Sequence, residues 1–130
     1  GVGYYNGGAV VTNSTSVITA AGANPNTVYF GFDSSEIDAQ GQAVLNQQAQ
    51  FLQANPSARV AIAGHTDERG SREYNLALGE RRAQAAQAYL ATSGVSASRM
   101  EAISYGEDQP ADPGHDESAW AKNRRAEISY

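Results

Sequence analysis

The sequence contains no cysteine, so neither a disulfide framework nor a thiolate metal site is available to it. This absence says nothing about the redox compartment. Positive charge is also scarce, because nine Lys and Arg residues stand against fourteen Asp and Glu residues, which leaves a net charge of −5. A nucleic-acid-binding surface needs a basic face, so this balance argues against nucleic acid as a partner.

Long apolar runs are missing as well. No run in the sequence approaches the roughly 20 apolar residues of a membrane-spanning helix. The 130 residues suffice for one domain with a modest core. The chain opens at Gly1 without Met, so we expect a processed or trimmed product, with any signal peptide or lipid-bearing residue upstream.

Residues 1–26 are rich in Gly, Asn, Thr and Ser and contain only short apolar pairs. Such low hydrophobicity is typical of a flexible tether. The alternative is that residues 17–20 add a short edge strand to the domain. We therefore predict a tether over residues 1–26 and a folded domain over residues 27–130.

Hydrophobic periodicity predicts four strands and three helices in this domain. The strands are expected at residues 27–32, 59–63, 100–105 and 125–130, and the helices at residues 39–54, 72–90 and 116–123. Asp38 and Ser71 are suited to cap the first two helices, and Gly94 to end the second.

The strand patterns also predict how the sheet is buried. The first strand alternates, which places Val28, Phe30 and Phe32 together on a half-buried face. The second strand is apolar on both faces, so we expect it to be central. The predicted fold is α+β, of the βαβαβ-β type: a mixed four-stranded sheet with two main helices packed on it as a two-layer sandwich.

The second helix carries two polar residues inside an apolar arc. At about 100° per residue, Asn75 and Arg82 fall in the middle of the arc, among Tyr74, Leu78, Ala83, Ala85, Ala86, Tyr89 and Leu90. An unpaired guanidinium on a packed surface costs several kcal/mol or more, so Arg82 needs a partner. The loop that leaves the second strand, residues 64–70, offers Asp67. We expect Asp67 and Arg82 to be the two poles of a small site at the end of the sheet.

Two interpretations of these poles remain open. One is a structural ion pair that fixes the loop to the helix, and the other is a ligand site. A zwitterion would suit the second interpretation, because its carboxylate matches the planar fork of Arg82 and its ammonium pairs with Asp67, with the Asn75 amide between them. This is binding chemistry without a reactive group.

Several neighbouring residues allow both a local and a functional role. Asp33 follows the first strand and is either a turn-forming residue or a ligand group at the strand end. Arg124 and Arg125 precede the last strand and are either a solvated pair or the source of a second guanidinium at the site.

The sequence gives little support for a catalytic site or a metal site. His65, Asp67, His115 and Asp116 match no zinc-ligand spacing, and no G-x-S-x-G or H-E-x-x-H motif occurs. A glycosidase would need two carboxylates that flank a cleft, and nothing specific in the sequence marks Asp33 and Asp67 as such a pair. We therefore expect no metal, no cofactor and no catalytic residue.

Several motifs occur together in one order. They are F-x-F-D at residues 30–33, G-H-T-D-E-R-G at 64–70, Y-N-x-x-L-G-E-R-R-A at 74–83, S-Y-G at 104–106, and G-H-D-E at 114–117 followed by N-R-R at 123–125. Over about residues 27–130, this pattern resembles the OmpA-like peptidoglycan-binding domain. The resemblance implies that family's fold and a non-catalytic module that holds the diaminopimelate residue of the cell-wall stem peptide.

The resemblance also implies roles for individual residues. Asp67 corresponds to the acid that binds the ammonium, Arg82 to the arginine that binds the carboxylate, and Asn75 to a supporting amide. The other residues that we assign to ligand binding are Phe32, Asp33, Leu78 and Arg124.

Proteins of this kind are expected in the periplasm, attached to the inner leaflet of the outer membrane through a lipid anchor upstream of this chain. A TolB-like periplasmic protein is the partner that the resemblance implies, over a surface that overlaps the wall site. The alternatives are a wall-cleaving enzyme and a module that mainly docks a partner protein.

Overall fold

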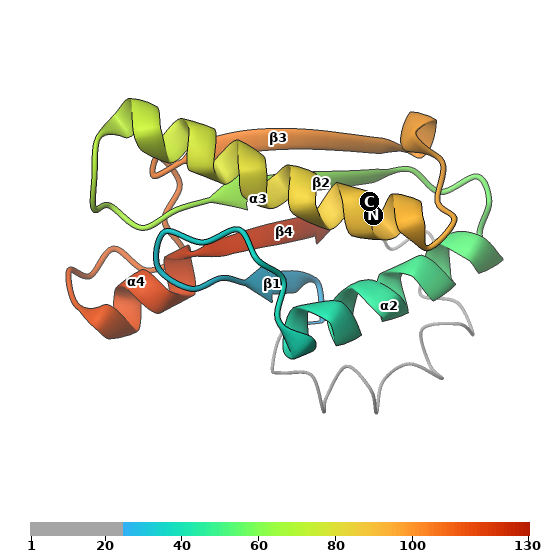
Figure 1. Cartoon of the computed structure of the whole chain (residues 1–130), viewed down its shortest axis with the longest axis horizontal. Helices are drawn as coiled ribbons and strands as arrows, with labels where there is room; N and C mark the ends of the chain where they lie inside the picture. Colours follow the sequence, from blue (N-terminus) through green and yellow to red (C-terminus); the bar gives the residue numbers. More distant parts are fainter. Residues whose placement is uncertain (1–24) are drawn as a thin grey trace.

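Four strands and three α-helices, with one turn of 3-10 helix, make up residues 25–130, the part of the chain that the computed structural model describes (Figure 1). In chain order the elements are β1 (Thr27–Tyr29), α2 (Ala39–Ala54), β2 (Val60–His65), α3 (Arg72–Thr92), η1 (Ala97–Arg99), β3 (Met100–Gly106), α4 (Glu117–Asn123) and β4 (Arg125–Ser129). The predicted tether lies almost wholly outside the described residues, and the alternative strand at residues 17–20 lies entirely outside them. No helix within the described part is long and apolar enough to cross a membrane.

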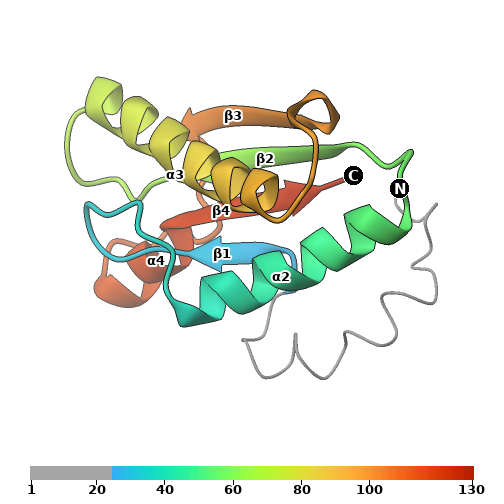
Figure 2. The same cartoon turned by 45° about the vertical axis from the view of Figure 1, so that its right-hand side comes forward.

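The strands form one mixed sheet in the order β1-β4-β2-β3. β2 and β3 are parallel, as their connection through α3 requires, whereas β4 is antiparallel to both β1 and β2. Helices α2 and α3 lie side by side over one face of the sheet, and α4 lies at one end (Figures 1 and 2). The predicted α+β sandwich and the central place of the second strand are confirmed.

The helix ends follow from local chemistry. The Asp38 carboxylate accepts a hydrogen bond from the Gly41 backbone N–H at 2.8 Å and so caps α2. The Ser71 hydroxyl accepts one from the Tyr74 N–H at 3.0 Å and caps α3. Gly94 adopts a φ of 99°, a left-handed conformation that glycine reaches without strain and that ends α3. All three predicted roles are confirmed.

The hydrophobic core lies between the sheet and the two main helices. Alternate residues of the strands meet the apolar faces of α2 and α3, and the least exposed members of the core are Val28, Leu45, Leu52, Ile62, Ala83, Ala86, Leu90 and Ala126. Burial of these side chains is the main force that holds the layers together. Asn75 and Arg82 are buried in α3 beside this core, with 2% and 1% exposure, so the predicted inward direction of both polar residues is confirmed.

Two strand boundaries differ from the sequence prediction by more than one residue. β1 ends at Tyr29, and Phe32 is 62% exposed instead of sharing the buried face with Phe30. The reason is a turn that follows directly, in which Asp33 adopts a φ of 54° and carries the chain out of the sheet. β2 continues to His65 because Gly64 and His65 keep their pairing with both neighbouring strands. The functional loop therefore begins at Thr66.

Candidate functional site

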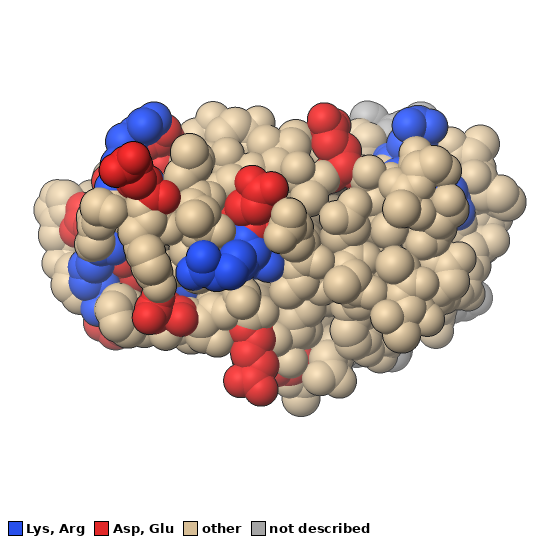
Figure 3. All heavy atoms as spheres, turned by 45° about the horizontal axis from the view of Figure 1, so that its top comes forward, with Lys and Arg blue, Asp and Glu red and all other residues tan. Residues whose placement is uncertain are grey.

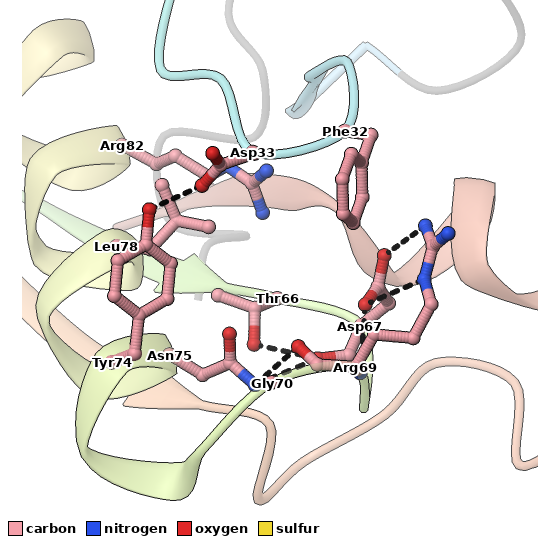
Figure 4. A pocket seen from close by; sticks show the side chains of 10 residues that line it. All are labelled: Phe32, Asp33, Thr66, Asp67, Arg69, Gly70, Tyr74, Asn75, Leu78 and Arg82. Carbon is pink, nitrogen blue, oxygen red and sulfur yellow. Dashed lines mark hydrogen bonds and ion pairs between the residues drawn. The ribbon is translucent and has the colours of Figure 1, made fainter.

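A pocket of about 200 Å³ opens between the loop after β1, the loop after β2 and the N-terminal half of α3. It is lined by Phe32, Asp33, Thr66, Asp67, Arg69, Gly70, Tyr74, Asn75, Leu78 and Arg82 (Figure 4). Tyr74 and Leu78 form one wall in this view, and Phe32, Asp67 and Arg69 form the opposite one. The pocket lining thus contains all the predicted ligand-binding residues except Arg124. Arg124 lies next to this lining, because its Nη1 is 3.8 Å from Asp67 Oδ2.

Arg82 is held by backbone carbonyl groups. Its Nε donates to the Ser34 carbonyl at 2.8 Å, Nη1 to the His65 carbonyl at 2.8 Å, and Nη2 to the Gly31 carbonyl at 3.1 Å. Since a guanidinium has five N–H groups, one on each terminal nitrogen is left without a partner among the described residues. Burial lowers the pKa of Arg82 to about 10, so the group is still protonated at neutral pH. Arg82 therefore presents a fixed positive charge to the pocket.

Asp67 and Arg82 do not form an ion pair with each other, because Asp67 pairs with other arginines. Both oxygens of Asp67 are taken by Arg69, whose Nη2 lies 2.8 Å from Oδ2 and whose Nε and backbone N–H lie 3.3 Å and 2.9 Å from Oδ1. Arg69 has this advantage because it is only two residues away in the same loop. The interpretation of Asp67 and Arg82 as a structural ion pair is therefore excluded, while both still line the same pocket.

The charge of Asp67 is stabilised despite its burial. Burial by itself would raise the pKa of this carboxyl, but the hydrogen bonds from Arg69 and the charges of Arg69 and Arg124 outweigh it and hold the pKa below its ordinary value. Asp67 is therefore a carboxylate throughout the neutral range.

Asn75 lines the pocket and also organises the loop through its amide nitrogen. Its Nδ2 donates to the Arg69 carbonyl at 3.0 Å and to Glu107 Oε1 at 2.7 Å, with the Asp67 carbonyl at 3.3 Å. These contacts tie the loop after β2 to the start of α3. This arrangement fits the supporting role that was predicted for the amide.

Asp33 has the turn-forming role that was considered for it, and its ligand-binding role stays a prediction. It sits in the turn after β1, where its φ of 54° is tolerated better by Asp than by most residues. Its carboxylate also accepts a hydrogen bond from the Tyr74 hydroxyl, which raises the pKa of that hydroxyl. This bond joins the loop after β1 to α3 along the edge of the pocket (Figure 4).

The structure separates the two arginines of the N-R-R motif. Arg124 turns toward the pocket wall, where Nη1 lies 3.8 Å from Asp67 Oδ2 and Nη2 lies 3.1 Å from Glu117. Arg125 instead pairs with Glu127 at 2.5 Å within β4. The strand pattern alone could not decide between them, but the family resemblance had pointed to Arg124.

Sequence reasoning missed Arg69 and Tyr74 as site residues. Arg69 belongs to the G-H-T-D-E-R-G motif, and its position two residues after Asp67 was a signal that the two side chains could meet. Tyr74 was placed on the buried arc, yet it is 45% exposed and forms a pocket wall. An aromatic residue in the first turn of a helix is often beyond the edge of the sheet that would cover it.

The residues considered for a metal site do not meet. His65 is stacked on Tyr105 with ring centroids 5.5 Å apart, whereas His115 pairs with Glu68 at 2.8 Å. Asp116 caps α4 by accepting from the Ala119 N–H. No group of three or more His, Asp or Glu residues in the described part is arranged to hold a metal ion.

His65 supplies a prediction for the pH dependence of stability. Its ring is 2% exposed, and both ring nitrogens lack hydrogen-bond partners among the described residues. Burial and, to a lesser extent, the charge of Arg125 lower its pKa to about 4, against a smaller opposing effect of Glu127. As the pH falls below about 6.5, the unfolded chain therefore takes up a proton that the folded protein resists until about pH 4.

The folded protein should accordingly lose about 2–3 kcal/mol of unfolding free energy through this group between pH 7 and pH 4. The measurement is urea denaturation across this range for the wild type and His65→Gln. The variant is expected to lose less unfolding free energy over this range, because glutamine does not titrate, whereas the carboxylates contribute equally to both proteins. Parallel curves would contradict a buried neutral His65.

Charged side chains gather at the end of the molecule that carries the pocket. The space-filling view shows acidic and basic groups interspersed at the end where the N-terminus of α3 and helix α4 lie, and far fewer over the other half (Figure 3). Charges of both signs therefore lie at the end of the molecule that carries the pocket.

Residues 29–124 match the OmpA family, and the chain belongs to this family. This confirms the resemblance that the motifs indicated.

Several individual proteins are similar to this chain over most of the described residues. The chain is 52% identical over 105 residues to the peptidoglycan-associated lipoprotein (Pal) of Haemophilus influenzae, with 81% of this chain and 69% of that protein covered. It is 50% identical over 102 residues to the Pal of Pseudomonas aeruginosa, of which it covers 60%. The crystal structure of Pal from Burkholderia pseudomallei is similar with a TM-score of 0.79 at 50% identity, over 81% of this chain and 89% of that one.

Proposed function

We propose that this protein is a non-catalytic anchor that binds peptidoglycan by recognising the diaminopimelate residue of the stem peptide. Similarity to proteins named peptidoglycan-associated lipoprotein supports the class of ligand. The pocket supports the chemistry, because it presents a fixed cation and a fixed anion.

The observation that carries the proposal is the state of Arg82. Its guanidinium is 1% exposed and lines the pocket, yet its hydrogen bonds go to carbonyl groups and not to a carboxylate. Burial of a charge is costly unless a counter-charge is present, and here the missing anion can come from a ligand. A carboxylate of diaminopimelate would engage the two remaining N–H groups of Arg82 side by side.

The other pole is Asp67. Its carboxylate lines the same pocket, and the ammonium group next to the ligand carboxylate would be directed toward it. Phe32 and Leu78 would contact the aliphatic chain of the ligand. A simple amine or a simple acid would satisfy only one of these poles, so the site favours an amino-acid head group.

We also propose a cellular setting that the same relatives support in part. We place the protein in the periplasm, held at the inner leaflet of the outer membrane by a lipid anchor upstream of this chain, since the relatives are named lipoproteins. A TolB-like periplasmic protein is proposed as a partner within a Tol-Pal system of envelope integrity and cell division. Competition between that partner and stem peptide would show whether their surfaces overlap.

The direct test is retention on purified peptidoglycan sacculi. The protein should sediment with sacculi that contain diaminopimelate, and free meso-diaminopimelate should release it. Cadaverine, which keeps both amino groups but lacks the carboxylates, should release it less well. Release of soluble wall fragments by the protein would instead favour the wall-cleaving alternative, for which the structure offers no supporting contact.

Replacement of Asp67 by asparagine should weaken binding to sacculi by about tenfold or more, because one charged pole is removed while the size of the side chain is kept. Asp108→Asn is the matched control, since Asp108 also pairs with an arginine, Arg72, but lies outside the pocket lining. Co-sedimentation over a range of sacculus concentrations measures both. Equal binding by the two variants would contradict a role for Asp67.

A further inference from the structure

Arg69 occupies the anionic pole of the pocket in this structure. Its guanidinium takes both oxygens of Asp67, and the ion pair is 2.8 Å long. The Asp67 side chain is 6% exposed, so little of it is left for any other cation. The ammonium of a ligand would therefore meet a carboxylate that is already neutralised.

The position of Arg69 is stabilised from both sides. Its guanidinium carbon lies 4.2 Å from the ring centroid of Phe32 and 4.1 Å from the nearest ring centroid of Trp120. Trp120 is itself oriented by a hydrogen bond from its Nε1 to Glu68 at 3.0 Å. Two aromatic faces thus hold the cation over Asp67.

This position is nevertheless one that Arg69 can leave. Its side chain is 32% exposed, and Phe32 is 62% exposed, so the stack lies at the surface. A second guanidinium, that of Arg124, also lies close to the Asp67 carboxylate. Its Nη1 is buried without a hydrogen-bond partner among the described residues and lies 3.8 Å from Asp67 Oδ2.

We propose that Arg69 is a built-in competitor for the ammonium subsite, which a ligand displaces from Asp67 when it binds. The inference rests on the proposed function and adds to it a step that the ligand must carry out. A ligand with an ammonium alone only exchanges one cation for another, and the tethered Arg69 has the higher local concentration. A zwitterion also gains the contact with Arg82, so it can displace Arg69 where a simple amine cannot.

The chain contains its own reporter for this displacement. Trp120 is the single tryptophan of the sequence, and it is in direct contact with Arg69. Its fluorescence should change when the guanidinium leaves its ring. Titration with free meso-diaminopimelate, followed both by calorimetry and by tryptophan emission, therefore measures binding and displacement separately.

The informative variant is Arg69→Met, which keeps an apolar side chain between the two rings and removes the charge. It should bind meso-diaminopimelate about 3- to 30-fold more tightly than the wild type, because the competent pocket no longer has to be opened first. It should also lose most of the emission change. The matched control is Arg72→Met, since Arg72 forms a similar two-point pair with Asp108 on an exposed surface outside the pocket lining. Arg72→Met should bind meso-diaminopimelate with the wild-type affinity and show the wild-type change in tryptophan emission.

Other outcomes overturn the inference. Weaker binding by Arg69→Met would show that Arg69 itself holds the ligand, and unchanged affinity would show that it does not compete. A wild type that binds without a change in emission would show that Arg69 stays in place. In these cases the wild type still binds, so the proposed function survives. Absence of binding to diaminopimelate and to sacculi by both proteins would overturn the proposed function, and this inference with it.

Discussion

Replacement of Arg82 by methionine is expected to abolish retention on diaminopimelate-containing sacculi. The substitution removes the only pocket-lining guanidinium that the described structure leaves without a carboxylate partner, so the ligand carboxylate loses its counter-charge. Loss of one partner of such a pair costs about 2–5 kcal/mol, or roughly 30- to 5,000-fold in affinity. Co-sedimentation with sacculi and calorimetry with meso-diaminopimelate measure the loss.

The same substitution also affects folding, and the control must account for this. Three carbonyl groups, those of Gly31, Ser34 and His65, would lose their donor, which should cost about 2–4 kcal/mol of unfolding free energy. Arg99 offers a matched case, because it also donates to three carbonyl groups, those of Leu52, Asn55 and Ala58, but it is not part of the pocket lining.

Arg99→Met should therefore be destabilised to a similar degree and still bind sacculi. Both variants are compared well below their unfolding midpoints, as established by circular dichroism. If Arg82→Met binds as well as Arg99→Met does, then Arg82 is a structural arginine and not the anion-binding pole.

Replacement of Gly64 by alanine should be the most damaging single change to the fold. A Cβ atom at Gly64 would lie 1.7 Å from the Gly79 carbonyl oxygen, 2.6 Å from the Gly79 carbonyl carbon and 3.2 Å from the Ala83 nitrogen. All of these are backbone atoms of α3, so no side chain can move aside. The helix must shift away from β2, and we expect a loss of more than about 4 kcal/mol or a failure to fold.

Gly31→Ala is the control for this prediction. The nearest atom to a Cβ at Gly31 is the Ser34 Cβ at 3.9 Å, which is an ordinary contact. That variant should stay within about 1 kcal/mol of the wild type in urea denaturation. A Gly64→Ala protein of near-normal stability would mean that α3 does not approach β2 as closely in solution.

The close approach at Gly64 also links the fold to the site. Gly79 faces Gly64 three residues before Arg82, and the strand that contains Gly64 continues into His65, whose carbonyl holds Arg82. Any shift of α3 away from β2 would therefore move the guanidinium away from its acceptors. Gly64→Ala should lose binding even if part of the population folds.

Local patterns in the sequence were enough for most of the secondary structure. The caps at Asp38 and Ser71 and the stop at Gly94 depend on interactions between residues a few positions apart, so they could be predicted one helix at a time. The failure at Phe32 has a local cause as well. Period-two alternation continued through Phe32, but it carries no information on where the turn at Asp33 takes the chain out of the sheet.

The sequence by itself determined that Asn75 and Arg82 face the interior, because helical periodicity fixes their direction relative to the rest of α3. Only the tertiary structure decided what they meet there. The acceptors of Arg82 come from the loop after β1 and from the end of β2, which are 17 to 51 positions away in the chain. Such partners depend on how the layers pack, so periodicity suggested Asp67 for Arg82, whereas folding assigned Asp67 to Arg69 and gave Arg82 backbone carbonyl groups as its partners.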